Sequence, residues 1–257
     1  MSFTVTHNAS DRGGVTAVQI DGARLSVFLP RVVEEYAEIG PTLRAHNQAV
    51  VGYLNRLADE FRDGLTGAKF TAEKEKTGRM MLPGFVSAVK AVQKEHAAVK
   101  LARIEMARLD ESKAPSPIVR SDLRRRVFAQ DAPNRIASLN NANYELACAC
   151  YEVGPDYFAV DDRIWEKFEQ RWIVLNHVKK SNLVLPRQST PENLTESGND
   201  DQRAEALAQK AVDKLTHRAE TLELAEDYLK QILRAVSVLT GLSAMDVLKE
   251  AGLASDD

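Results

Sequence analysis

The stretch that decides the fold lies toward the C-terminal end of the chain: residues 204–239, AEALAQKAVDKLTHRAETLELAEDYLKQILRAVSVL. Its apolar positions recur at alternating spacings of four and three residues over about five heptads, with one charged interruption. This spacing keeps one stripe of side chains facing a single neighbour along the helix. We therefore expect a long amphipathic, coiled-coil-like helix. Its apolar stripe, called the seam below, comprises Ala204, Ala208, Ala211, Leu215, Arg218, Leu222, Ala225, Leu229, Ile232, Val236 and Leu239.

Two kinds of neighbour can cover this seam: helices of the same chain, or a helix of a second copy or of another protein. Residues 186–202 contain one large apolar residue, Leu194, and bury too little surface to offset the entropy of ordering. We expect a flexible linker there, which favours an external partner. Arg218 either fixes the register of the contact or extends its stem toward water. The expected partner-binding residues are Leu215, Leu222, Leu229, Ile232, Val236 and Leu239.

The N-terminal end has the pattern of a small β-hairpin. Two β-rich runs, residues 15–20 and 23–29, flank Asp21-Gly22, and this dipeptide suits a tight turn in which both residues have positive φ. Residues 3–7 are a candidate third strand. Because an isolated hairpin is marginally stable in water, we expect residues 1–30 to pack on the core or to extend it.

The rest of the chain has helical periodicity, so the expected fold class is mainly α: a multi-helix domain at residues 31–185, and a long helix plus a short terminal helix at 203–257. Gly40-Pro41 predicts a break in the first helix. Ser243 and Asp246 form a variant of the capping box before the terminal helix. Within the domain we expect helices at 31–62, 84–111, 119–129, 134–152 and 161–180, with either a loop alone or a loop and one short helix at 63–83.

Composition excludes several classes of protein. The 257 residues are 44% hydrophobic and 28% charged with a net charge of −3, which is typical of a globular protein and not of a general polyanion binder. The two cysteines, Cys148 and Cys150, cannot form a disulfide framework. The first residues lack the features of a signal peptide, and no apolar run approaches the ~20 residues that span a bilayer. We expect a cytoplasmic protein without membrane contact.

Charge is unevenly distributed along the chain. Residues 79–126 contain eleven Lys or Arg against five Asp or Glu, whereas residues 189–257 contain seven against fourteen. A basic segment binds phosphates through counterion release, or it pairs with an acidic segment of its own chain or of a neighbour. If the partner is a nucleic acid, the expected binding residues are Arg120, Arg124, Arg125 and Arg126, beside Phe128.

We find no spacing typical of a catalytic or metal site. The five histidines lie too far apart for a helical ligand pair, and two cysteines two residues apart on a helix point in different directions. We therefore expect no catalytic, metal-binding or cofactor-binding residue. The leading hypothesis is a non-enzymatic assembly or adaptor protein that self-associates, or binds a helical protein partner, through its C-terminal helix. The alternative is a nucleic-acid-binding accessory or regulatory protein. An enzyme whose residues are scattered along the chain comes third.

Overall fold

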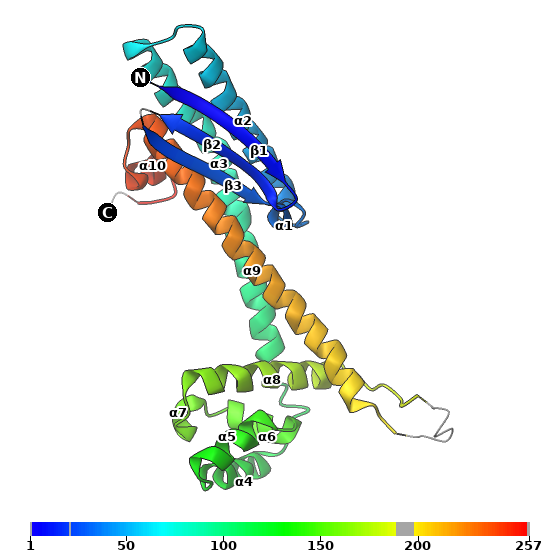
Figure 1. The fold of residues 1–257 in the computed structure, drawn as a ribbon. Coiled ribbons are helices and arrows are strands. Elements are labelled where there is room, and N and C mark those ends of the chain that lie inside the picture. The colour runs from blue at the N-terminus through cyan, green and yellow to red at the C-terminus, as the bar shows by residue number, and fades with distance from the viewer. Residues whose placement is uncertain (1, 21, 189–197, 256–257) are drawn as a thin grey trace. The chain divides into compact units, whose positions relative to one another are not determined.

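The computed structural model describes residues 2–20, 22–188 and 198–255, and this part of the chain is mainly α (Figure 1). The described residues form one three-stranded antiparallel sheet and ten helices. The expected fold class is confirmed, including the N-terminal β structure and the long C-terminal helix. The chain divides into two compact units: unit 1 contains Met1–Val99 and Arg218–Asp257, and unit 2 contains Lys100–His217.

The sheet of unit 1 has the order β1-β2-β3. The predicted strands are confirmed, and β1 is longer than expected; Asp21, in the predicted turn, lies outside the described residues. Thr16, Val18 and Ile20 are buried at alternate positions, so one face of the sheet covers the core. The strand bounds are Phe3–Ser10 for β1, Gly13–Ile20 for β2 and Ala23–Pro30 for β3.

Unit 1 also contains α1, α2 and α10, together with most of α3 and the C-terminal part of α9. The break predicted at Gly40-Pro41 is confirmed, because α1 ends before it and α2 begins at Gly40. Ser243 caps α10 as expected: its Oγ accepts a hydrogen bond from the Asp246 amide at 3.2 Å. The bounds are Arg31–Glu34 for α1, Gly40–Arg62 for α2, Gly67–Ala107 for α3, Asp201–Thr240 for α9 and Ala244–Glu250 for α10.

The expected loop at 63–83 is wrong over most of its length. Helix α3 starts at Gly67 and continues through Pro83, although proline removes one helical N–H and crowds the preceding turn. Packing explains the nearby Gly78. A Cβ there would lie 2.7 Å from Cγ2 of Thr240 and 3.1 Å from Cβ of Leu239. Gly78 therefore permits close contact between α3 and α9, rather than ending a helix.

Unit 2 consists of five shorter helices and the adjoining ends of α3 and α9. The single helix expected at 134–152 is two helices, because Asn143 caps a new one: its Oδ1 accepts from the Leu146 amide at 3.0 Å. Asp161 caps α8: its Oδ1 accepts a hydrogen bond from the Arg163 amide at 2.9 Å. The bounds are Pro117–Phe128 for α4, Ala132–Asn140 for α5, Tyr144–Tyr151 for α6, Pro155–Phe158 for α7 and Asp162–Lys180 for α8.

Trp172 on α8 is at the centre of the unit 2 core. It is fully buried, its ring stacks on Tyr144 and Tyr151, and its Nε1 donates to the Ala107 carbonyl at 2.8 Å. This core includes residues on both sides of the boundary expected at 185, because α9 contributes Ala208. The two units therefore do not coincide with the domains expected at 31–185 and 203–257, because helices α3 and α9 each contribute residues to both units.

The expected linker at 186–202 falls largely on residues 189–197, which lie outside the described part of the chain. At its two ends, Pro186 and Asn199 form an isolated antiparallel bridge, and α9 begins at Asp201.

Candidate interaction surfaces

The seam of α9 faces the interior of the chain. The period identified the buried face correctly: the six expected partner-binding residues, Leu215, Leu222, Leu229, Ile232, Val236 and Leu239, are at most 8% exposed. In unit 1 the neighbours of α9 belong to the same chain. Gln231 accepts a hydrogen bond from the Phe28 amide at 2.7 Å, and the ring of Tyr228 packs edge-on against that of His46. The seam is therefore part of the core, and a surface that binds a partner has to be formed by other residues.

Arg218, the charged residue of the seam, is held in a polar cluster of unit 1. Its Nη2 donates to Oε1 of Glu95 at 2.5 Å, and its Nε donates to the Tyr36 hydroxyl at 2.8 Å. The Tyr36 hydroxyl donates in turn to the same Glu95 oxygen. Burial and the neighbouring carboxylate raise the pKa of Tyr36 to about 12. Arg218 is thus held by Tyr36 and Glu95 of its own chain, and a role in fixing the register of a contact with a partner stays a prediction.

Two of the four expected nucleic-acid-binding arginines are engaged inside unit 2. Arg120 is buried, and its Nη1 lies 2.9 Å from a carboxylate oxygen of Glu111. Arg124 forms an ion pair with Glu152, whose carboxylate also lies 3.6 Å from Nε of Arg120. These charges are neutralised locally and hold α4 against α6, so they are poorly placed to contact phosphates.

The other two arginines of this cluster, Arg125 and Arg126, are exposed. Arg126 pairs with Asp122 one turn earlier on α4, at 2.8 Å. Within the described part of the chain, the Arg125 side chain has neither a hydrogen bond nor an ion pair. Arg125 is therefore the cation of the predicted cluster that remains available to a partner.

Large apolar side chains are exposed around Arg125. On α4, Ile118 is 83% exposed and lies seven residues before Arg125, and Phe128 is 51% exposed and lies three residues after it, so all three share one side of the helix. Tyr157 of α7 packs against Phe128 with ring centroids 5.3 Å apart. We call the surface formed by Ile118, Val119, Arg125, Phe128 and Tyr157 the α4–α7 surface.

Arg135 supports the aromatic pair Phe128–Tyr157 of this surface. Arg135 lies over the Phe128 ring at 5.4 Å and donates to three backbone carbonyls, of Phe158, Phe128 and Gln130, at 2.6–3.0 Å. Exposed apolar surface that is rigidly supported is typical of binding sites. The basic cluster is visible in the charge pattern of the sequence, whereas the exposed apolar residues around it are brought together only by the fold.

No known protein family, curated protein or solved structure matches this chain. The candidate surfaces therefore rest on geometry and chemistry alone.

The outer side of α9 carries some of the acidic residues of the segment 189–257. Glu220, Glu223, Leu224 and Asp227 are spaced to share one side of the helix, away from the seam, and all four are exposed. Leu224 is 41% exposed, and Asp227 pairs with Lys230 at 3.0 Å. We call this set the acidic α9 face. These positions can be identified in the sequence, because they lie on the side of the helix opposite the apolar positions of the heptad pattern.

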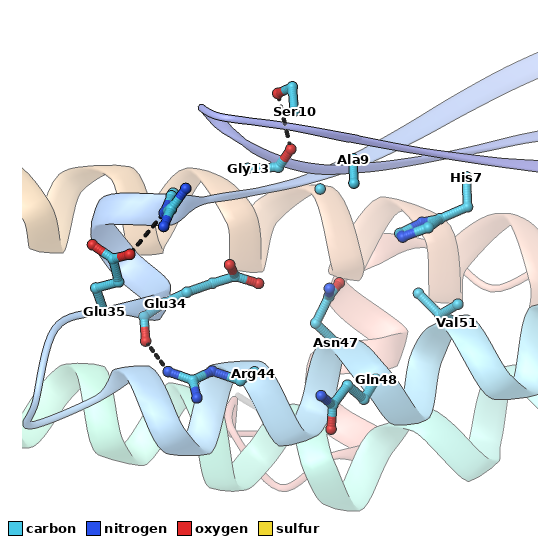
Figure 2. Close-up of a pocket in the computed structure, with 12 residues that line it drawn as sticks. His7, Ala9, Ser10, Gly13, Glu34, Glu35, Arg44, Asn47, Gln48 and Val51 are labelled. Carbon is cyan, nitrogen blue, oxygen red and sulfur yellow. Dashed lines mark hydrogen bonds and ion pairs between the residues drawn. The ribbon is translucent and has the colours of Figure 1, made fainter.

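A groove of about 630 Å³ lies between the sheet and helices α1 and α2 (Figure 2). Some of its polar groups satisfy one another. Arg44 donates to the Glu34 carbonyl at 2.6 Å, Arg31 pairs with Glu35 at 2.7 Å, and Ser10 donates to the Gly13 carbonyl at 3.1 Å. These contacts stabilise the corner between β3 and α2, whereas the Glu34 carboxylate and the Asn47 and Gln48 amides line the groove without a hydrogen bond or ion pair in the described part of the chain.

The remaining chemical candidates lie in the core or are scattered. Burial raises the pKa of both thiols, to about 12 for Cys150, and neither cysteine is bonded to another. Across residues 2–20, 22–188 and 198–255, no group of three or more His, Cys, Asp or Glu side chains is arranged to hold a metal ion.

In the described chain, no single helix combines the length and apolarity needed to cross a membrane. Helices α9 and α10 together meet the criteria of length and composition, but they are bent by 94° at the break between them.

Proposed function

We propose that this chain is a non-catalytic helical scaffold that self-associates, with the α4–α7 surface of one copy bound to the acidic α9 face of another. The observation that carries the proposal is the α4–α7 surface itself, where Ile118 and Phe128 flank an unpaired Arg125. The sequence analysis expected association through the seam of the C-terminal helix; the proposed contact uses the outer side of this helix instead, because the seam is buried.

Complementary chemistry supports this pairing. The acidic α9 face presents Glu223 beside the exposed Leu224, and the α4–α7 surface presents Arg125 between exposed apolar side chains. Opposite charges at the rim of an apolar contact favour encounter and fix orientation. Because each copy carries both surfaces, the contact can close reciprocally as a two-fold dimer or continue head-to-tail as a ring or an open filament.

Reversing one charge is expected to weaken the assembly, and reversing both is expected to restore it. Arg125→Glu places like charges opposite each other, so we expect about tenfold weaker self-association. Adding Glu223→Arg to the same chain recreates the pair with its signs exchanged. Light scattering after size-exclusion chromatography, over a range of protein concentrations, measures the mass of each variant.

A matched control separates this contact from a general effect of charge. Arg12 is an exposed arginine between β1 and β2, belongs to neither surface, and Arg12→Glu is expected to leave the mass unchanged. A full-length protein that remains monomeric at every concentration contradicts the proposal. So does a loss of mass in Arg125→Glu that Glu223→Arg does not reverse.

A specific observation also favours a second function, the binding of single-stranded nucleic acid. Arg125 and Arg126 are neighbours on the exposed side of α4, and the ring pair Phe128–Tyr157 adjoins them. Exposed aromatic rings next to cations form stacking platforms for unpaired bases, and each stacked base contributes about 1–3 kcal/mol. With Arg120 and Arg124 neutralised inside unit 2, fewer cations remain than the sequence cluster suggested.

Under this alternative, an oligothymidylate of about 20 nucleotides should bind at low salt and dissociate as salt is raised. The pair Arg125→Ala and Arg126→Ala should weaken binding and flatten its salt dependence, whereas Arg12→Ala, between β1 and β2, should not. Phe128→Ala should weaken binding at every salt concentration. Fluorescence anisotropy of a labelled oligonucleotide measures all three, and no binding at low salt removes this function.

A further inference from the structure

A second groove of unit 1, with a volume of about 620 Å³, lies between α2 and α3. Its walls are largely apolar, and none of the side chains that line it is a lysine, arginine, aspartate or glutamate. Met80 is 40% exposed at the groove, and a methionine side chain adapts readily to the shape of a ligand. The α2 wall includes Thr42, Ala45, His46 and Tyr53, and the α3 wall includes Met80, Met81, Pro83 and Gly84.

An imidazole without a partner lies in the wall of this groove. His46 is 5% exposed, and its Nε2 is buried with no hydrogen-bond partner in the described structure. The buried hydroxyl of Tyr228 also lacks a partner, and the two rings meet edge-to-face with centroids 6.4 Å apart. Because Nε2 is buried, a ligand in the groove reaches the imidazole through the other ring nitrogen, Nδ1, which also has no hydrogen-bond partner in the described structure and lies beside Gly84 of the groove wall.

Helix α3 has a glycine, and so no side chain, at the point where it faces this imidazole. Pro83 and Gly84 are adjacent in a helix interior, where both residues are unfavourable. A Cβ at Gly84 would lie 2.5 Å from Nδ1 of His46, so the bare backbone is what admits the edge of the ring. The absence of a side chain at Gly84 therefore leaves the edge of the imidazole beside the groove.

We propose that the α2–α3 groove binds an uncharged small molecule with an apolar body and one hydroxyl group, the hydroxyl contacting Nδ1 of His46. A hydroxyl both donates and accepts a hydrogen bond, so it fits either tautomer of the neutral ring. Burial lowers the pKa of His46 to about 4, which keeps the ring neutral at physiological pH. Because no charged side chain lines the groove, an ionic ligand has no counter-charge there. This site is independent of the proposed self-association.

The matched probes p-cresol and toluene test the site on the full-length chain. The two molecules have similar shape and differ by one hydroxyl. We expect p-cresol to shift the methyl resonance of Met80 and the ring resonances of His46 in a saturable manner, with about fivefold higher affinity than toluene. The absence of saturable binding of p-cresol overturns the proposal, and equal affinities for the two probes overturn the hydrogen bond to His46.

Two groove variants and one control complete the experiment. Gly84→Ala places a methyl group against the imidazole, and Ala45→Phe fills the groove from an exposed position without altering the core. We expect each variant to lower the affinity for p-cresol at least tenfold. Gly52→Ala, on the same helix α2 with no atom within 4 Å of the new Cβ, should leave it unchanged. Unchanged binding in Ala45→Phe overturns the site even if Gly84→Ala fails to fold.

Discussion

Arg218→Ala is expected to lower the free energy of unfolding of unit 1 by about 3 kcal/mol. The substitution leaves Glu95, which is 7% exposed, with the Tyr36 hydroxyl as its remaining hydrogen-bond donor. An unpaired buried carboxylate is strongly destabilising, because the protein cannot replace the water that the charge has lost. The Arg218 side chain is 34% exposed, so part of its charge is solvated and the effect falls at the lower end of the range for buried pairs.

The double variant Glu95→Leu with Arg218→Leu distinguishes loss of the pair from loss of packing. Two apolar residues of similar length avoid the cost of desolvation, so we expect a stability within about 1 kcal/mol of the original protein. Both tryptophans, Trp165 and Trp172, lie in unit 2, so tryptophan fluorescence does not report on unit 1. Amide hydrogen exchange in α2 and α9 provides the measurement. A loss below about 1 kcal/mol in Arg218→Ala contradicts the structural role of this cluster.

The seam shows what sequence periodicity predicts about a helix and what it does not. The heptad spacing predicted which side of residues 204–239 is buried, and burial of Leu222, Ile232 and Val236 confirms it. The period carries no information about the neighbour, because helices of the same chain and helices of a second copy require the same apolar stripe. Arg218 was visible as an interruption, but its partner Glu95 is 123 residues away in sequence and only the fold brings them together.

Local signals succeeded where local chemistry decides the structure, and they failed where packing decides it. The caps at Asp161 and Ser243 were predictable because the capping side chain bonds to the backbone two or three residues away. Helix α3 was missed because Gly78 and Pro83 oppose a helix by propensity, while contacts with other parts of unit 1 hold one there. The number of arginines available to a nucleic acid was overestimated, because Glu111 and Glu152, which neutralise Arg120 and Arg124, lie outside α4.

Lowering the pH from 7.5 to 4 is expected to lower the free energy of unfolding of unit 1 by about 3 kcal/mol through His46 alone. Burial lowers the pKa of this imidazole to about 4 in the folded chain, against 6.5 for a free histidine. Between these two values the unfolded state binds a proton that the folded state does not. Stability therefore falls as the pH drops below 6.5, and the effect levels off below about 4.

This pH window is separate from that of the polar cluster around Glu95. Hydrogen bonds from Tyr36 and Arg218 outweigh desolvation and hold the pKa of Glu95 below its usual 4.5. The stability that Glu95 contributes therefore persists at neutral pH and is lost only as the pH falls through that lower value.

The variant His46→Phe tests the titration of His46, because it keeps a ring in place but cannot titrate. Hydrogen exchange in α2 should become nearly independent of pH between 6.5 and 4.5 in this variant, after correction for intrinsic exchange rates. His177→Gln, in unit 2, should retain the full dependence of unit 1, and an unchanged slope in His46→Phe would assign the titration to another group.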